Sequence, residues 1–259
     1  SDAFITKLFK STDLNENVLS FVKFKEEQQL KKTDGKRFGR VLVPKLEDAN
    51  LASNPKTASQ CTLILTEGDS AKALAVAGLG VVGRARYGVF PLRGKLLNVR
   101  DASSRQISEN AEFTNLKKIL GLKQGAKYDS VKDLRYGKVM IMADQDTDGS
   151  HIKGLIINLF DTFYPELLKI SGFLQEFITP VLVATKKSNK KVKEMFFSEQ
   201  EYLQWRNRMP DKAASWDVKY YKGLGTSSDV EGRQYFRNLD FHCKSFAPIT
   251  PEERAMLDL

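Results

Sequence analysis

The feature that most constrains the fold is a pattern that occurs twice along the chain. A short apolar run is followed at once by acidic residues, a glycine and a helix-forming stretch, first at Cys61–Thr66 and again at Lys138–Ala143. Further strand-length runs occur at 89–92 and 173–184, and helical periodicity is found at 107–120 and 152–163. This alternation predicts an α/β fold with a mainly parallel sheet covered by helices on both faces.

Composition narrows the possible classes of function. The 259 residues are 41% hydrophobic and 28% charged, which is typical of a globular protein. The sequence contains no run of eighteen apolar residues, the length that would predict a membrane span. The sequence contains only two cysteines and two histidines, Cys61, Cys243, His151 and His242, which are too few for a zinc cage or a disulfide framework. Any chemistry must therefore depend mainly on carboxylates. The net charge of +9 indicates either a polyanionic partner or an ordinary solvated surface.

Three aspartates follow the second of these strands. Asp144, Asp146 and Asp148 stand at alternate positions after the strand, at the sheet edge where open α/β folds bind ligands. Carboxylates crowded together repel one another unless a cation neutralises them. Oxygen ligands without nearby Cys or His select a hard ion, so the pattern favours Mg²⁺, for which Mn²⁺ or Ca²⁺ can substitute.

Three other interpretations fit this acidic segment less well. Residues 144–149 match the first half of an EF-hand loop, but the twelfth position is Leu155 instead of Glu, and a strand precedes the loop. A phosphatase-type motif with a nucleophilic aspartate lacks an evident partnering base. The aspartates could also serve only as helix caps, but one cap needs one Asp, so three make that account less favoured.

Three further motifs accompany the aspartates. Glu67, after the first strand, supplies a fourth carboxylate at the equivalent edge of a neighbouring strand. Residues 91–100 place cations around Gly94, which suits phosphate contacts but also an ordinary basic loop. Residues 220–226 contain two glycines that let backbone N–H groups approach a phosphate, although such turns are common.

In order and spacing, these four motifs resemble those of type IIA DNA topoisomerases, and the eukaryotic enzymes more than bacterial gyrases. The eukaryotic features are at residues 73–79, 177–180 and 220–222. The resemblance implies a TOPRIM domain, a Rossmann-like metal-binding fold, over residues 61–180, preceded by a helix and followed by an α+β extension. Its implied divisions are the end of a transducer at 1–33, a linker at 34–60, the extension at 181–240, and at 241–259 a linker toward an absent winged-helix domain.

The resemblance also assigns roles to residues. It implies metal ligands at Glu67, Asp144, Asp146 and Asp148, and catalytic roles for Glu67, Asp144, Asp146 and Lys95. It implies DNA contacts from Arg93, Lys95, Asn98, Lys222 and Gly223. A pocket for cleavage-trapping drugs is implied at Gly68, Asp69, Arg93 and Gly94.

The implied function is Mg²⁺-dependent cleavage and religation of double-stranded DNA for ATP-driven strand passage, in the nucleus. The nucleophilic tyrosine and the ATP-binding domain are expected outside this chain, which alone should be inactive, and the full-length enzyme is expected to be a homodimer. A TOPRIM-type nuclease or primase is the rival, but it need not keep residues 91–95 or 222–226. A basic module that only binds DNA does not account for four carboxylates.

Overall fold

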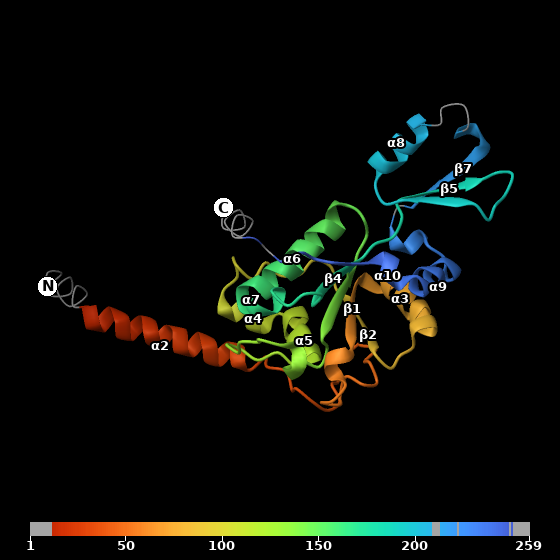
Figure 1. The fold of residues 1–259 in the computed structure, drawn as a ribbon. Helices are drawn as coiled ribbons and strands as arrows, with labels where there is room; N and C mark the ends of the chain where they lie inside the picture. Colours follow the sequence, from red (N-terminus) through yellow and green to blue (C-terminus); the bar gives the residue numbers. More distant parts are fainter. Residues whose placement is uncertain (1–11, 209–212, 222, 249, 251–259) are drawn as a thin grey trace.

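The computed structural model describes residues 12–208, 213–221, 223–248 and 250, and is built around a five-stranded sheet (Figure 1). The strand order is β2-β1-β3-β4-β8. The strands are β1 (Thr62–Glu67), β2 (Tyr87–Leu92), β3 (Lys138–Met142), β4 (Leu174–Phe177) and β8 (Cys243–Ser245). Neighbouring strands among the first four are parallel, and β8 is antiparallel to β4. The predicted mainly parallel sheet is confirmed.

Helices cover both faces of this sheet, also as predicted. On one face, α3 (Gly68–Val82) and α9 (Asp229–Arg237) pack with Ile64 of β1 in one buried cluster. On the other face, α5 (Ala111–Leu120) and α6 (Thr147–Phe163) pack with Leu63 and Leu65. The alternation of side chains along β1 therefore feeds two separate cores, one on each side of the sheet. This places the carboxyl ends of β1 and β3 between the starts of α3 and α6.

The stretch at 107–120 was predicted as one helix and forms two. The helix α4 (Ser104–Glu109) ends at Asn110, whose side chain then caps α5 by accepting a hydrogen bond from the backbone N–H of Phe113 at 2.9 Å. Gly121 ends α5 in the left-handed conformation, at φ 76°, as its position in the sequence indicates. One residue with a capping side chain was enough to divide the helix.

The segment at 34–60, predicted as a linker, is irregular but packed. Its alanines Ala49, Ala52 and Ala58 are buried. Asp48 accepts hydrogen bonds from the guanidinium of buried Arg135 and from the hydroxyl of Tyr136. Residues 40–43 are irregular, and Glu47 forms an isolated antiparallel bridge to Val89. This segment therefore belongs to the body of the sheet domain.

The helix predicted near the N-terminus is present as α2 (Thr12–Lys31) and projects from the body (Figure 1). Its last turn is held by buried Lys117, whose ammonium group donates to the carbonyl of Leu30 at 3.2 Å and to Asp34 at 2.8 Å. Because Lys117 lies in the core, the loss of hydration is the main cause that lowers its pKa, and Asp34 opposes this effect. The base of α2 is thus fixed to α5.

A second, smaller sheet follows at the end of the molecule away from α2 (Figure 1). Its antiparallel order is β6-β5-β7, with β5 (Leu182–Lys186), β6 (Lys193–Phe196) and β7 (Trp216–Tyr220). The helix α8 (Glu199–Arg208) backs it, and Trp205 meets Trp216 edge to face. The extended stretch predicted at 173–184 is therefore two strands in two different sheets.

The predicted linker at 241–259 begins instead with regular structure. The short helix α10 (Leu239–His242) leads into β8, which extends the main sheet by pairing with β4. His242 is buried, and one of its ring nitrogens lies 2.8 Å from the carbonyl of Ile178. The remaining elements are α7 (Pro165–Leu168) and the 3-10 turns η1 (Ala58–Gln60), η2 (Val131–Asp133), η3 (Ala213–Ser215) and η4 (Leu224–Thr226). Of the helices in the described ranges, none is both long and apolar enough for a membrane crossing.

Candidate metal centre

The candidate site lies where β1 and β3 end side by side. The parallel register pairs Thr66 with Met142, so Glu67 and the residues after Met142 leave the sheet at the same edge. The backbone N–H of Asp144 donates a hydrogen bond to the Glu67 carboxylate at 3.0 Å. The two sequence motifs that supply Glu67 and Asp144 therefore meet directly.

Glu67 is half-buried, with acidic neighbours. Burial is the main cause that raises the pKa of its carboxyl group, and the negative charges of Asp144, Asp146 and Asp148 raise it further. The hydrogen bond from the backbone of Asp144 acts in the opposite direction. A carboxyl group with a raised pKa is suited to proton transfer, and the excess negative charge beside it is what a bound cation would relieve.

Asp144 is held by a turn from a distant part of the chain. The backbone N–H of Leu224 donates to its carboxylate at 2.7 Å, and Leu224 itself is buried in the α3–α9 core. The neighbouring Gly223 approaches so closely that a Cβ there would lie 2.2 Å from the other carboxylate oxygen of Asp144. Gly223 also has φ +151°, a conformation that side chains disfavour. Gly223, which was predicted to contact DNA, therefore also lies directly against Asp144.

Asp146 serves as the N-cap of α6. Its carboxylate accepts a hydrogen bond from the backbone N–H of Gly149 at 2.8 Å. One of the three aspartates therefore does carry the capping role that the alternative interpretation assigned to such residues. The other two have different partners.

Asp148, in the first turn of α6, forms an ion pair with Lys95 at 2.8 Å. This pair lowers the pKa of Asp148, chiefly through the hydrogen bond from Lys95. Both side chains are about half exposed or more, at 49% for Lys95 and 65% for Asp148. The basic loop after β2 thus reaches the aspartate segment.

The rest of the basic loop is divided between the site and its surroundings. Arg93 and Lys95 are exposed. Asn98 instead accepts a hydrogen bond from the side chain of Asn158 at 2.6 Å and donates to Asp101. Sequence reasoning missed Glu112 on α5, which accepts a hydrogen bond from the backbone of Arg93. Burial is the main cause that raises the pKa of Glu112, and this hydrogen bond opposes the rise. The acidic first turn of α5 was the available signal for this support.

The residues predicted to border a drug pocket lie at the start of α3 and in the basic loop. Gly68 begins α3, and Asp69 forms an ion pair with Lys45 at 2.6 Å, which is the main cause that lowers its pKa. A separate small cavity of about 40 Å³ lies beside Asp146 and Gly223. Its other lining residues are Gln145, Thr179, Pro180, Val181, Tyr220 and Tyr221. All of these except Val181 lie in motif segments that the sequence analysis identified, but the cavity that they form together was not predicted. Lys222, predicted to contact DNA, lies outside the described residues.

The four carboxylates share one sheet edge but do not converge on one point. Among the residues that the structure describes, no three His, Cys, Asp or Glu side chains form a group able to hold a metal ion. Asp146 is turned to its helix and Asp148 to Lys95, while Glu67 and Asp144 remain next to each other. The all-oxygen donor set and the raised pKa of Glu67 fit a hard divalent cation. To bind that cation, the Asp148 carboxylate would have to leave its ion pair with Lys95.

Comparison with known proteins identifies the family. Residues 62–177 match the Toprim domain, and residues 177–259 match the C-terminal associated domain of TOPRIM. The chain is 57% identical over 246 residues to DNA topoisomerase 2 of Arabidopsis thaliana, which covers 95% of this chain and 16% of that protein. It is 51% identical over 261 residues to DNA topoisomerase 2-beta of Homo sapiens, covering 98% of this chain and 16% of that protein.

A solved structure is also similar. The Plasmodium falciparum topoisomerase II DNA-binding, cleavage and re-ligation domain matches with a TM-score of 0.75 and 53% sequence identity. The match covers 80% of this chain and 28% of that one. The chain thus spans about one sixth of the length of these curated relatives, and it corresponds to one region of them.

Proposed function

Because the chain belongs to the eukaryotic type II DNA topoisomerases, as the segment that carries their TOPRIM domain, we propose that it supports Mg²⁺-dependent cleavage and religation of double-stranded DNA. The observation that carries this proposal is the meeting of four motifs at one sheet edge. Glu67, Lys95, Asp144 and Leu224 come from parts of the chain up to 157 positions apart (224 − 67), and each takes part in a contact to the aspartate segment. TOPRIM domains of topoisomerases generally depend on a divalent metal.

The proposed metal ligands are Glu67, Asp144, Asp146 and Asp148. When bound, Mg²⁺ would supply charge stabilisation for the oxygen that leaves the scissile phosphate. Asp144 is fixed in place by the N–H of Leu224, and Glu67 sits next to it. Asp148 would exchange its ion pair with Lys95 for the metal, which would free Lys95 to contact a DNA phosphate.

The proposed proton-transfer group is Glu67. Burial is the main cause that raises the pKa of its carboxyl group, which favours exchange of a proton with the 3′-oxygen during cleavage and religation. The exposed cations Arg93 and Lys95 would hold the DNA backbone. Asn98, Lys222 and Gly223 complete the proposed DNA contacts. Gly68, Asp69, Arg93 and Gly94 form the proposed drug pocket.

The nucleophilic tyrosine is proposed to come from a domain outside this chain. Tyr221 lies close to the site, but it is buried, and its hydroxyl donates a hydrogen bond to Glu231 at 2.5 Å. Its loss of hydration, the main cause, and the nearby Glu231 both raise the pKa of Tyr221, which makes it a poor nucleophile. Homodimerisation, ATP hydrolysis by a separate domain and action in the nucleus are proposed for the whole enzyme.

The test is DNA cleavage by a full-length DNA topoisomerase 2 in which this segment replaces the corresponding one. Cleavage of plasmid DNA with Mg²⁺ should leave protein covalently attached to the 5′ ends. The Glu67→Gln variant should lose at least about a hundredfold in cleavage rate, as expected for removal of a general acid or base. The matched control is Glu109→Gln on exposed α4, which should cleave normally. Cleavage that leaves protein-free ends would instead support the nuclease alternative.

A further inference from the structure

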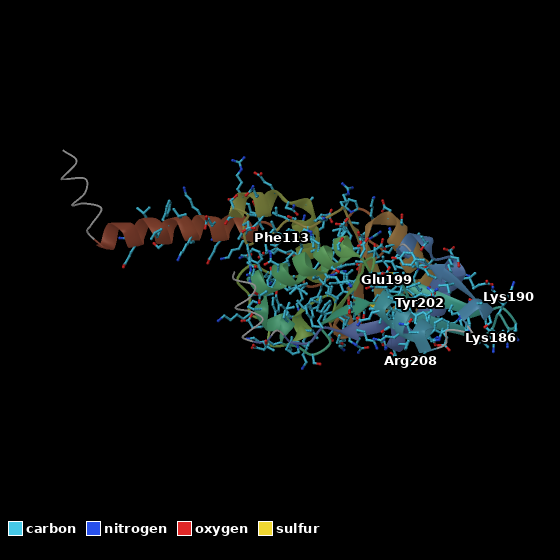
Figure 2. All side chains as sticks on the ribbon, turned by 90° about the horizontal axis from the view of Figure 1, so that it is seen from above. Phe113, Lys186, Lys190, Glu199, Tyr202 and Arg208 are labelled. Atoms are coloured by element: carbon cyan, nitrogen blue, oxygen red, sulfur yellow. The ribbon has the colours of Figure 1, made fainter. Side chains whose placement is uncertain are left out.

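A strongly basic hairpin tip lies far from the metal centre (Figure 1). Residues 186–193 run from the last residue of β5 to the first residue of β6, and they contain no acidic residue and five lysines: Lys186, Lys187, Lys190, Lys191 and Lys193. Figure 2 shows Lys186 and Lys190 at the end of the molecule opposite α2. All five lysines are exposed. We refer to residues 186–193 as the lysine hairpin.

The shape of this hairpin is fixed by its backbone and by one side chain. The N–H of Lys186 donates to the carbonyl of Val192 at 3.0 Å, and the N–H of Val192 donates to the carbonyl of Asn189 at 3.0 Å. The side-chain oxygen of Asn189 accepts from the N–H of Lys191 at 3.1 Å, which is the asparagine turn typical of tight loops. The lysine side chains are therefore not needed to form the turn and are displayed on a defined scaffold.

The positive charge of the hairpin is poorly compensated. Among the described residues, the only ion pair that these five lysines form joins Lys187 to Asp217 of β7. Its N–O distance is 3.8 Å, near the limit for such a pair. Both partners are largely exposed, so the pair contributes little. Like charges held together at the tip repel one another, and a polyanion would relieve that repulsion.

Geometry and chemistry favour duplex DNA as that polyanion. A two-stranded β-ribbon fits the major groove of B-form DNA, and a β5–β6 tip has this form. Lysine ammonium groups bind phosphates as point charges and do not read bases in the bidentate manner of Arg, Asn or Gln. The chemistry of the hairpin therefore matches sequence-independent contact with the phosphate backbone.

We propose that the lysine hairpin is a second DNA contact, at which lysine ammonium groups bind phosphates of the duplex at a distance from the metal centre. This inference rests on the proposed function, because it takes DNA as the substrate. It adds a contact site on the smaller sheet to the motifs that surround Glu67 and Asp144. Its role would be to hold the duplex, with no part in cleavage.

The experiment measures binding of the 259-residue chain to a fluorescent 40-base-pair duplex over a series of salt concentrations, with EDTA present. The test variant carries Gln in place of Lys186, Lys190, Lys191 and Lys193. The control variant carries Gln in place of Lys23, Lys25, Lys31 and Lys32, four exposed lysines of α2 and its end, and so has the same net charge. Each phosphate contact contributes about 0.9 to the slope of log affinity against log salt, so the test variant should lose about 2 to 3 from this slope and the control should keep it.

The outcomes test the lysine hairpin as a DNA contact separately from the proposed function. Equal effects of the two variants, or no DNA binding by the parent chain, would overturn the hairpin proposal. So would equal affinity for poly-glutamate and DNA, because the site would then recognise any polyanion. As a local check, DNA should protect Lys190 and Lys191 from acetylation while Lys23 and Lys25 stay reactive. Because EDTA removes metal from every sample, these results do not depend on the metal centre, which the Mg²⁺ titration described below tests separately.

Discussion

The two strand-to-helix turns of the site follow the same sequence pattern but hold their acidic residues differently. After β1, Glu67 occupies the N-cap position of α3 and makes no side-chain cap hydrogen bond, because its carboxylate is turned to the backbone of Asp144. After β3, Asp146 occupies the N-cap position of α6 and does cap it. Asp144 is held by Leu224, and Asp148 by Lys95.

This difference separates two kinds of acidic residue at one sheet edge. Asp146 has a structural role in the absence of metal, so its removal should cost stability as well as function. Glu67 is half-buried beside other negative charges and caps nothing, so its removal should affect function without a loss of stability. A residue kept in an unfavourable electrostatic setting is typical of functional sites. Substitutions at the two turns should therefore differ in their effects on stability and on metal binding.

The largest effect is expected from Gly223→Ala. The new Cβ would lie 2.2 Å from an Asp144 carboxylate oxygen, and Ala would have to adopt φ +151°, so the turn must move away from Asp144. We expect a loss of about 1–3 kcal/mol in the free energy of unfolding and about a 10- to 100-fold loss of Mg²⁺ affinity, because Asp144 loses its orientation. Denaturant unfolding and calorimetry measure the two effects.

Gly225→Ala is the matched control for that substitution. A Cβ at Gly225 would lie 3.8 Å from the side chain of Ser70, an ordinary contact. This variant should bind Mg²⁺ as the parent does. Equal losses in the two variants would mean that the Gly223 turn does not position Asp144.

Because Asp146 caps α6, we expect two substitutions there to differ in the free energy of unfolding but not in Mg²⁺ affinity. Asp146→Ala should lower the free energy of unfolding by about 1 kcal/mol, because the N–H of Gly149 loses its acceptor. Asp146→Ser should retain most of this stability, since Ser is also a good cap, yet it should bind Mg²⁺ as weakly as the Ala variant. Urea denaturation together with calorimetry of both variants checks this. If the Ser variant is as unstable as the Ala variant, the cap is not what Asp146 contributes.

For Glu67→Gln, the opposite sign is expected. Removal of a half-buried negative charge beside three aspartates should leave the free energy of unfolding unchanged or raise it by up to about 1 kcal/mol, since Gln can still accept the hydrogen bond from Asp144. Urea denaturation without metal measures it. A destabilisation as large as that of Asp146→Ala would show that the two turns do not differ as proposed.

Asp148→Asn should have the smallest effect on stability. Its ion pair with Lys95 is exposed, and such pairs contribute at most about 0.5 kcal/mol, less when salt is added. Unfolding measured in low and high salt should show a small difference that salt removes. A loss above about 1 kcal/mol that persists in high salt would indicate that Asp148 is held by more than this pair.

Sequence patterns predicted the parts of the fold that depend on local periodicity. The strands around Leu63 and Val139 and the helix after Asp146 follow from apolar runs, acidic turns and capping residues, and they occur where expected. The break at Asn110 was missed because the apolar spacing continues through it. The strand β8 was missed because Cys243–Ser245 is too short for a pattern, and its pairing with β4 is a long-range contact.

The site shows the same division between local and long-range information. The pairing of β1 with β3 made the meeting of Glu67 and Asp144 predictable, because parallel strands end at one edge. The close approach of Gly223 to Asp144 was not predictable, since it depends on how α9 packs against α3 and carries the preceding turn with it. The supporting role of Glu112 likewise depends on the packing of α5 beside the basic loop.

Calorimetric titration of the chain with Mg²⁺ or Mn²⁺ tests whether the four motifs form one metal centre. The titration is made with a nicked duplex present, so that DNA phosphates are available, and with an Asp144→Asn, Asp146→Asn double variant alongside. The Glu109→Gln variant serves as the control. If the motifs form one centre, the parent and the control should bind the metal, and the double variant should lose metal binding while it still binds DNA. Equal metal affinity in all three proteins would contradict this expectation.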